Sequence, residues 1–192
     1  MEPPLAPGRL YRFAWWFYLL LAVAGAVWIG ARRGTIPLAL FVDRRLWPLD
    51  VLLGVAAAGL LVGLWRLGRR LPAARELEAS LGGLLGPLDR TDVAGLALLS
   101  GFAEELFFRG AVQDALGWLP AVLLFALLHS GPGRPFRLWS VFAIAAGLLF
   151  GGLTLWRGNL LAAVVGHVLV NAVNLRELVD SRPLRRERKE RP

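Results

Sequence analysis

The stretch Ala103-Glu104-Glu105-Leu106-Phe107-Phe108-Arg109 decides how this chain folds, because it places three charged residues inside an apolar run. Between residues 93 and 113 every other position is apolar or small, apart from Ser100 and Gln113. An ionised carboxylate at the centre of a bilayer costs at least ~3 kcal/mol, so such charges face protein or a hydrated cavity and find partners there. The stretch therefore predicts a membrane-spanning helix with a polar face directed into the protein.

Composition places the chain among polytopic membrane proteins. It has 192 residues, of which 56% are hydrophobic and 19% are charged, whereas a soluble domain carries roughly 25% charged residues. The absence of cysteine excludes thiol catalysis, disulfides and cysteine-based metal sites. The net charge of +8 comes without the interleaved aromatic residues of nucleic-acid binders, so we expect contact with lipid head groups and no nucleic-acid partner.

The predicted fold class is all-α, a polytopic transmembrane helical bundle of about six spans plus a short interfacial helix, since a span needs ~20 helical residues. An N-terminal part, residues 1–92, holds two spans and an interfacial segment. A core of four spans follows at residues 93–175, and a basic cytoplasmic tail at 176–192. The predicted spans are residues 13–31, 46–65, 93–113, 115–130, 138–156 and 158–175.

The basic residues predict the orientation in the membrane, because cytoplasmic loops carry an excess of Lys and Arg. With both termini in the cytoplasm, most of the 22 Lys and Arg residues fall on the inner side. The tail from Arg182 to Pro192 is strongly charged, and we expect it to be disordered and to contact head groups. The expected localisation is the cell membrane, as a multi-pass protein with cytoplasmic N- and C-termini.

The charged triplet predicts two different roles for its two glutamates. Glu105 and Arg109 are four residues apart on a helix, which allows a salt bridge along one face. Glu104 is rotated by about 100° and has no such local partner. We interpret Glu105 and Arg109 as a neutralised structural pair and Glu104 as the carboxylate directed at a site. The alternative is that all three form a packing network between helices.

The two histidines of the chain extend this polar set. His129 closes the fourth predicted span, and His167 lies within the sixth, with Asn171 one helical turn further on. A glutamate beside imidazoles can act as a general base toward water, and an amide can donate to a developing oxyanion. The set of Glu104, His129 and His167 would alternatively hold a divalent metal, typically Zn²⁺, that polarises water.

These residues form three motifs, each on its own predicted span: Glu-Glu-x-x-x-Arg, then Phe-x-x-x-His, then His-x-x-x-Asn. Together and in this order they resemble the CAAX-protease and bacteriocin-processing family of intramembrane peptidases, also called abortive-infection proteins. The resemblance covers roughly residues 93–175, while residues 1–92 match no motif, and family members often have about eight spans. The matching positions are Glu104, Glu105, Arg109, Phe125, His129, His167 and Asn171.

The resemblance implies a role for each motif residue. The first glutamate, Glu104, would activate water together with the two histidines, and Asn171 would shape the oxyanion site. Glu105, Arg109 and Phe125 would support this arrangement. A metal at the glutamate and the two histidines is an open alternative within the family.

We therefore predict an intramembrane endopeptidase that depends on glutamate, with or without a metal, and acts on a peptide or a membrane-anchored protein. His-Glu-x-x-His is absent. Ser100-Gly101 lacks the glycine of intramembrane serine proteases two residues earlier, where Leu98 stands, and no pair of aspartates suggests an aspartyl protease. The alternatives are a non-catalytic scaffold or immunity-type binding protein, and a small proton-coupled transporter, although the spans show no inverted repeat.

This prediction requires one spatial arrangement. Glu104 must lie within about one water-bridged contact, ~6–7 Å, of the imidazole rings. His129 stands at the end of its span, so its helix must stop short and the following loop, Gly131 to Pro135, must dip inward.

Overall fold

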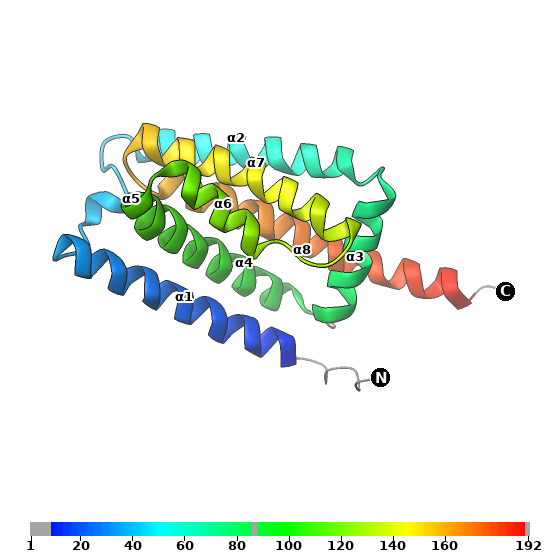
Figure 1. Ribbon diagram of the computed structural model, residues 1–192. Helices are drawn as coiled ribbons and strands as arrows, with labels where there is room; N and C mark the ends of the chain where they lie inside the picture. The colour runs from blue at the N-terminus through cyan, green and yellow to red at the C-terminus, as the bar shows by residue number, and fades with distance from the viewer. Residues whose placement is uncertain (1–8, 86–87, 191–192) are drawn as a thin grey trace.

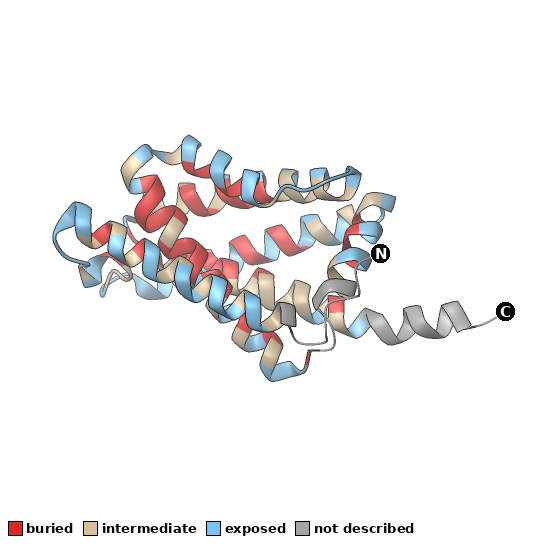
Figure 2. Cartoon of the chain, turned by 60° about the horizontal axis from the view of Figure 1, so that its bottom comes forward, coloured by how far each residue is buried: buried red, intermediate tan, exposed pale blue. Residues whose placement is uncertain are grey.

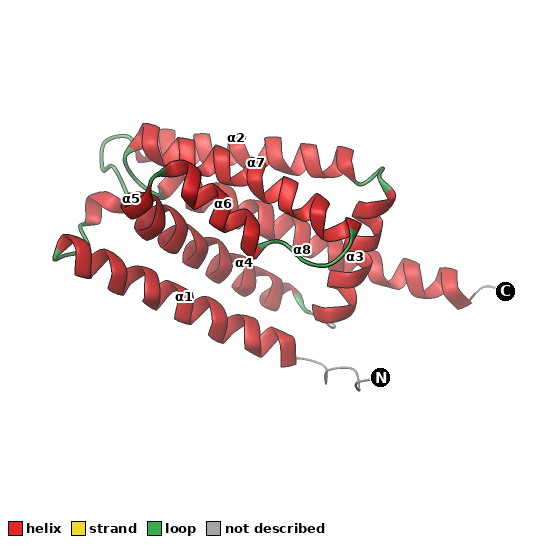
Figure 3. Cartoon of the chain, in the orientation of Figure 1, coloured by secondary structure: helices red, strands yellow, loops and turns green. Residues whose placement is uncertain are grey.

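The computed structural model describes residues 9–85 and 88–190, with side chains described for residues 11–82 and 88–180. This part of the chain is helical and contains no strand, which confirms the predicted all-α class (Figure 3). The longest helices run side by side and alternate in direction along the chain (Figure 1). Their bounds are α1 Arg9–Arg33, α2 Trp47–Gly68, α3 Pro72–Leu85, α4 Arg90–Glu105, α6 Trp118–Leu128, α7 Arg134–Arg157 and α8 Leu161–Glu190.

The short elements lie between these helices. A 3₁₀ turn, η1, spans Leu38–Leu40 in the connection from α1 to α2. The helix that carries the charged triplet runs on from α4 without interruption through a π-helical segment, η2 (Leu106–Val112), into α5 (Gln113–Leu116). Gly117, with a φ of +91°, then turns the chain into α6, and this left-handed backbone favours glycine.

Four of the helices are long and apolar enough to cross a membrane: residues Tyr11–Arg33, Trp47–Gly68, Arg134–Arg157 and Leu161–Asp180. They match four of the predicted spans. The third predicted span, residues 93–113, lies within the uninterrupted helical run that α4, η2 and α5 form together. The fourth, residues 115–130, is reduced to α6, whose 11 residues fall short of a full span. About six membrane passes are a plausible count for the described residues, which form the runs α1, α2, α4 to α5, α6, α7 and α8 besides the transverse α3.

The predicted interfacial segment at residues 66–92 contains α3, which lies across one end of the bundle (Figure 1). We call this the α3 end. Both termini and the connection from α6 to α7 lie at the α3 end, and the connections from α1 to α2, α5 to α6 and α7 to α8 lie at the opposite end (Figure 1). Ala74 and Leu77 bury one side of α3 against the bundle. The predicted tail prolongs α8 as far as Glu190, and its side chains from residue 181 onward lie outside the described residues.

Glycines allow α8 to lie close to two neighbours. A Cβ atom on Gly101 of α4 would come within 2.8 Å of the Val168 side chain, and one on Gly54 of α2 within 2.6 Å of the Ala162 carbonyl oxygen. Such approaches are possible only for residues without a side chain. Because α4 and α8 touch in this way, the motif residues on the two helices come face to face.

The buried residues lie on the inner parts of the bundle and the exposed residues on its outside (Figure 2). Many of the exposed residues are large and apolar. Phe108 and Phe150 are among the largest fully buried side chains. Exposed leucines and aromatic residues on α1, α2 and α6 suit contact with lipid tails rather than water.

Helix α4 begins with a capping box. The Asp89 carboxylate accepts a hydrogen bond from the backbone N–H of Asp92 at 2.7 Å, and the Asp92 carboxylate accepts one from the backbone N–H of Asp89.

Candidate active site

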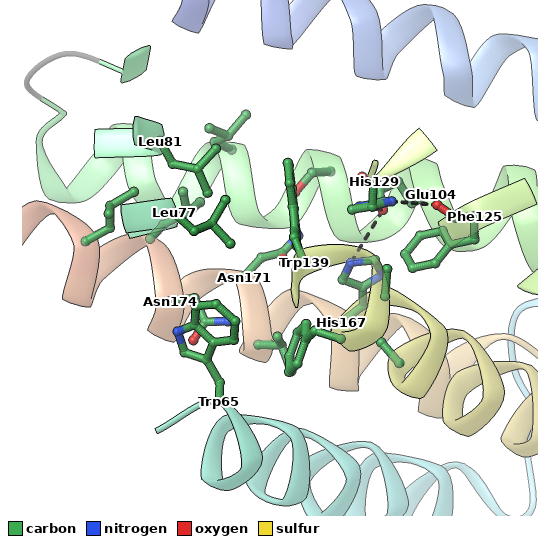
Figure 4. A pocket seen from close by; sticks show the side chains of 18 of the residues that line it. Trp65, Leu77, Leu81, Glu104, Phe125, His129, Trp139, His167, Asn171 and Asn174 are labelled. Atoms are coloured by element: carbon green, nitrogen blue, oxygen red, sulfur yellow. Dashed lines mark hydrogen bonds and ion pairs between the residues drawn. The ribbon is translucent and has the colours of Figure 1, made fainter. Parts of the chain in front are cut away.

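A cavity of about 280 Å³ lies inside the bundle, between α4, α7 and α8 and toward the α3 end. Its wall is largely apolar, with Trp65, Trp139 and Phe142 among the larger side chains. Figure 4 shows Trp65 and Trp139 among the side chains around the cavity, together with the motif residues Glu104, His129, His167 and Asn171. The polar side chains that line the cavity are Tyr18, Glu78, Ser100, Glu104, His129, His167, Asn171, Asn174 and Glu177.

Glu104 and the two imidazoles meet at the inner part of this cavity, as the sequence predicted (Figure 4). The Glu104 Oε2 atom lies 3.5 Å from His167 Nε2 and 3.8 Å from His129 Nε2. Both distances are well inside the reach of one bridging water. The Glu104 side chain is only 7% exposed, and within the described residues its Oε2 atom accepts no hydrogen bond.

Both histidines present an unprotonated nitrogen to Glu104 when they are neutral. His129 Nδ1 lies 2.8 Å from the carbonyl oxygen of Phe125, and His167 Nδ1 lies 2.6 Å from Glu105 Oε1. Each of these partners only accepts hydrogen bonds, so each Nδ1 carries the proton and each Nε2 is left with its lone pair. Three acceptor atoms therefore converge, and a water molecule is the donor that such a group can orient.

Glu105 joins two of the predicted residues. Its Oε1 atom lies 3.0 Å from Arg109 Nη1, which is the predicted pair four residues apart. The same oxygen contacts His167 Nδ1, a partner that the sequence did not indicate. The carboxylate thus fixes the tautomer and the orientation of His167 while Arg109 balances its charge.

Arg109 belongs to the π-helical segment η2, not to a regular α-helix. Its guanidinium lies over the Phe125 ring, 4.5 Å from the centroid, and is almost completely buried. A cation over an aromatic face is an attractive contact in a desolvated place. π-helical turns inside helices frequently occur at functional sites, and here the segment follows directly after the two glutamates.

His129 reaches the cavity because α6 ends at Leu128 and leaves His129 as its C-terminal cap. This is the short helix that the sequence required. The His129 ring packs against Phe125 at a centroid distance of 4.3 Å and edge-on against Trp139 at 5.2 Å. The Phe125 ring therefore packs against one side of the imidazole, and the Phe125 carbonyl oxygen accepts a hydrogen bond from His129 Nδ1.

Asn171 lines the cavity one helical turn from His167, on the side of the α3 end (Figure 4). Its Nδ2 atom donates to Ser100 Oγ at 2.9 Å. The amide is thus close to the predicted site.

Tyr18 and Ser100 are polar residues of this cavity that sequence reasoning did not assign to the site. Tyr18, which looks like an aromatic residue of the membrane interface, lines the cavity, and its hydroxyl interacts with the Glu104 carboxylate. Ser100 stands four residues before Glu104, and this helical spacing was the available signal that it shares a face with Glu104. For Tyr18 no signal existed, because its helix carries no motif.

Glu104, His129 and His167 are residue types that bind zinc. As the side chains are placed, however, the described part of the chain contains no group of three His, Asp or Glu side chains that could hold a metal ion.

Comparison with known proteins identifies the segment that carries these residues. The family model described as type II CAAX prenyl endopeptidase Rce1-like matches residues 87–173. In this segment the chain is similar to the Rce1-like family. The Rce1-like segment includes all seven motif residues, from Glu104 to Asn171.

One curated relative, the "Uncharacterized protein YpbD" of Bacillus subtilis (strain 168), is 39% identical over 80 residues. The match covers 41% of this chain and 41% of the relative, so the chain spans less than half the length of that protein. No solved structure matches the chain.

Proposed function

We propose that this protein is an intramembrane endopeptidase of the CAAX type in which Glu104 activates the water. The observation that carries the proposal is the convergence of Glu104 Oε2 with the Nε2 atoms of His129 and His167 on a cavity inside a membrane protein. The Rce1-like family of residues 87–173 supports protease activity. The substrate would be a peptide or a membrane-anchored protein.

The geometry suggests how the water is held. A water between the three acceptors donates one O–H to Glu104 Oε2 and the other to a histidine Nε2, which leaves an oxygen lone pair for the carbonyl carbon. Glu104 takes the first proton as the new C–O bond forms, and returns it to the leaving nitrogen as the C–N bond breaks. The histidines keep their Nδ1 protons throughout, because Glu105 and the Phe125 carbonyl hold them.

Asn171 is the donor for the negative charge that develops on the carbonyl oxygen. Its amide lies in the cavity wall next to His167, and donors of this kind are typically responsible for factors of about 10²–10³ in rate. Arg109 does not line the cavity, and we assign it to the neutralisation of Glu105 rather than to the substrate.

Orientation decides from which side a substrate enters. The cavity extends toward the α3 end, where Glu78, Glu177 and Leu178 line it. The start of α1 and the described end of α8 lie at this end (Figure 1). Arg66 in the last turn of α2 and Arg134 at the start of α7 lie there too. By the positive-inside rule the α3 end is cytoplasmic, so the substrate would enter from the cytoplasmic side.

The decisive experiment replaces the proposed base. We expect Glu104→Gln to lower cleavage by at least about 10²-fold, the usual contribution of a general base. The assay uses purified protein in liposomes and a quenched fluorescent CAAX peptide, with and without a prenyl group, and the exposed α3 residue Glu76 supplies the control Glu76→Gln. Cleavage by Glu104→Gln at the parent rate would contradict the proposal.

Two further measurements separate the alternatives. Proton flux into the same liposomes that disappears in Glu104→Gln, without peptide cleavage, would indicate a transporter. A zinc atom found by elemental analysis of the purified protein, together with loss of cleavage on chelation, would indicate that Glu104, His129 and His167 rearrange around a metal. We expect cleavage to resist the chelator.

A further inference from the structure

Two polar pairs face each other across the contact between α4 and α8. On α4, Ser100 and Glu104 are one helical turn apart, and on α8 the same holds for His167 and Asn171. The helices run in opposite directions, so Glu104 meets His167 and Ser100 meets Asn171. The Ser100 hydroxyl thus lies beside the Asn171 amide, one helical turn from the proposed base Glu104. The two contacts are neighbours in the same cavity wall.

Ser100 is built as an acceptor toward Asn171. Its residue is 3% exposed, and its own hydroxyl proton points at the Ala97 carbonyl oxygen one turn earlier on α4, at 3.4 Å. The oxygen lone pairs are then left for the Asn171 amide, which donates at 2.9 Å. Within the described residues Ser100 makes no hydrogen bond to an imidazole, so nothing there would remove its proton and make it a nucleophile.

The hydrogen bond restricts what Asn171 can do. A carboxamide has two N–H groups on one nitrogen, and when one of them is held the plane of the group is fixed. The other N–H then has a defined direction, while a free amide would rotate. Ser100 and Asn171 both line the cavity, so the direction of the second N–H determines whether it can donate to a substrate carbonyl there.

We propose that Ser100 is a positioning residue for the reaction: it accepts one N–H of Asn171 and so directs the other toward the oxyanion. This inference rests on the proposed function, because it assigns a part of the same site. It predicts that Ser100 acts on turnover only through Asn171. A hydrogen bond that merely joins two helices would instead affect stability and leave kcat unchanged.

The test is a double-mutant cycle on cleavage of the quenched CAAX peptide by the full chain in liposomes. The variants are Ser100→Ala, Asn171→Ala and the two combined, and melting of each confirms that it folds. Ser80→Ala is the matched control, because the Ser80 hydroxyl bonds to a carbonyl one turn earlier on α3 and lies outside the cavity. It should cleave at the parent rate.

We expect Ser100→Ala to lower kcat by about tenfold with KM unchanged, since the interaction that is lost is made in the transition state. Asn171→Ala should lower kcat by about 10²-fold. The combined variant should match Asn171→Ala within about twofold, because without the amide the serine has nothing to direct.

Two results would overturn the inference, and they differ from each other. If Ser100→Ala cleaves at the parent rate, or if its effect multiplies with that of Asn171→Ala, Ser100 does not act through the amide and the proposed function stands. If neither the parent nor Glu104→Gln cleaves the peptide while both fold, the proposed function fails, and the inference fails with it.

Discussion

Asp50 and Glu104 are both buried carboxylates in apolar helices, and their surroundings differ completely. Asp50 lies in α2 near the end opposite α3, where Arg157 Nε donates to one of its oxygens at 2.5 Å and Asn159 Nδ2 to the other at 3.0 Å. Glu104 faces a cavity, and its Oε2 atom meets two imidazole nitrogens that offer no proton. One carboxylate has its hydrogen-bonding capacity filled by protein, and the other keeps it open.

The difference shows which property distinguishes a reactive acid from a structural one. Burial alone does not, because Asp50 is at 0% exposure and Glu104 at 5%. The partners differ: the carboxylate of Asp50 is filled and stabilises the turn between α7 and α8, while the Oε2 atom of Glu104 is open, as the proposed binding of a water requires. Four predictions test this comparison.

The largest effect on stability should come from the filled carboxylate. Asp50→Ala leaves the Arg157 guanidinium, 11% exposed, without its closest partner, and losing one side of a buried pair costs about 3–5 kcal/mol. The thermal melt of the detergent-purified protein should shift accordingly, while cleavage per folded molecule stays at the parent value. Asp43→Ala is the control, because Asp43 is 39% exposed and lies 3.8 Å from the same arginine.

The open carboxylate should behave in the opposite way. Glu104→Gln removes a buried charge that no donor satisfies on Oε2, and its amide can donate to a histidine Nε2. We expect the free energy of unfolding to stay constant or to rise by about 1 kcal/mol, as when an active-site group is traded for stability. A melt lowered as much as that of Asp50→Ala would show that Glu104 is structural.

Tyr18 sharpens the comparison, because its hydroxyl is a protein group that does interact with Glu104. Tyr18→Phe should lower kcat by about two- to tenfold, the value of one hydrogen bond of about 0.5–1.5 kcal/mol, and leave KM unchanged. Tyr11, the other tyrosine of the chain, lies on the same helix outside the cavity, so Tyr11→Phe is the matched control. Equal cleavage rates for Tyr18→Phe and Tyr11→Phe would show that the Tyr18 hydroxyl does not contribute to cleavage.

The smallest effect should come from an exposed carboxylate. Asp114, an exposed residue of α5, accepts hydrogen bonds from the Arg33 guanidinium, which hold the pKa of the Asp114 carboxyl below its usual range. A lowered pKa contributes stability at neutral pH, and this is lost as the pH falls through the pKa of the folded state. Melting at pH 7 and at about pH 3 should show a slightly larger drop for the parent than for Asp114→Asn, because surface pairs contribute little. A drop of the same size in both proteins would show that the Arg33–Asp114 pair does not contribute to the pH dependence of stability.

The helical class and the three motifs were predictable, because apolar periodicity and the spacing within one helix are local properties. The early end of α6 was a requirement of the predicted site, since His129 stands two residues before Gly131-Pro132-Gly133, although the predicted span ran to Ser130. The π-helical segment was not. Its residues, Leu106 to Val112, read like any apolar helix, and the wider turn depends on how they pack against α1 and α6.

The partners between distant helices could not be predicted. The contact of Glu105 with His167 joins residues 62 positions apart, and that of Ser100 with Asn171 joins residues 71 apart. Tyr18 comes from a helix without any motif. Such contacts follow from the close packing of α4 on α8 and of α1 on α4, which the glycines permit but do not specify by sequence alone.

The shortness of α6 has a consequence for the surrounding lipid. Its 11 residues rise by about 16 Å, roughly half of the ~30 Å of hydrocarbon in a bilayer. Its outer face is leucine-rich and exposed, so acyl chains beside it must compress, and the head-group layer sinks toward His129. In the proposed cleavage, a scissile bond would then not need to reach the mid-plane of an undisturbed membrane, because the interface would lie closer to His129.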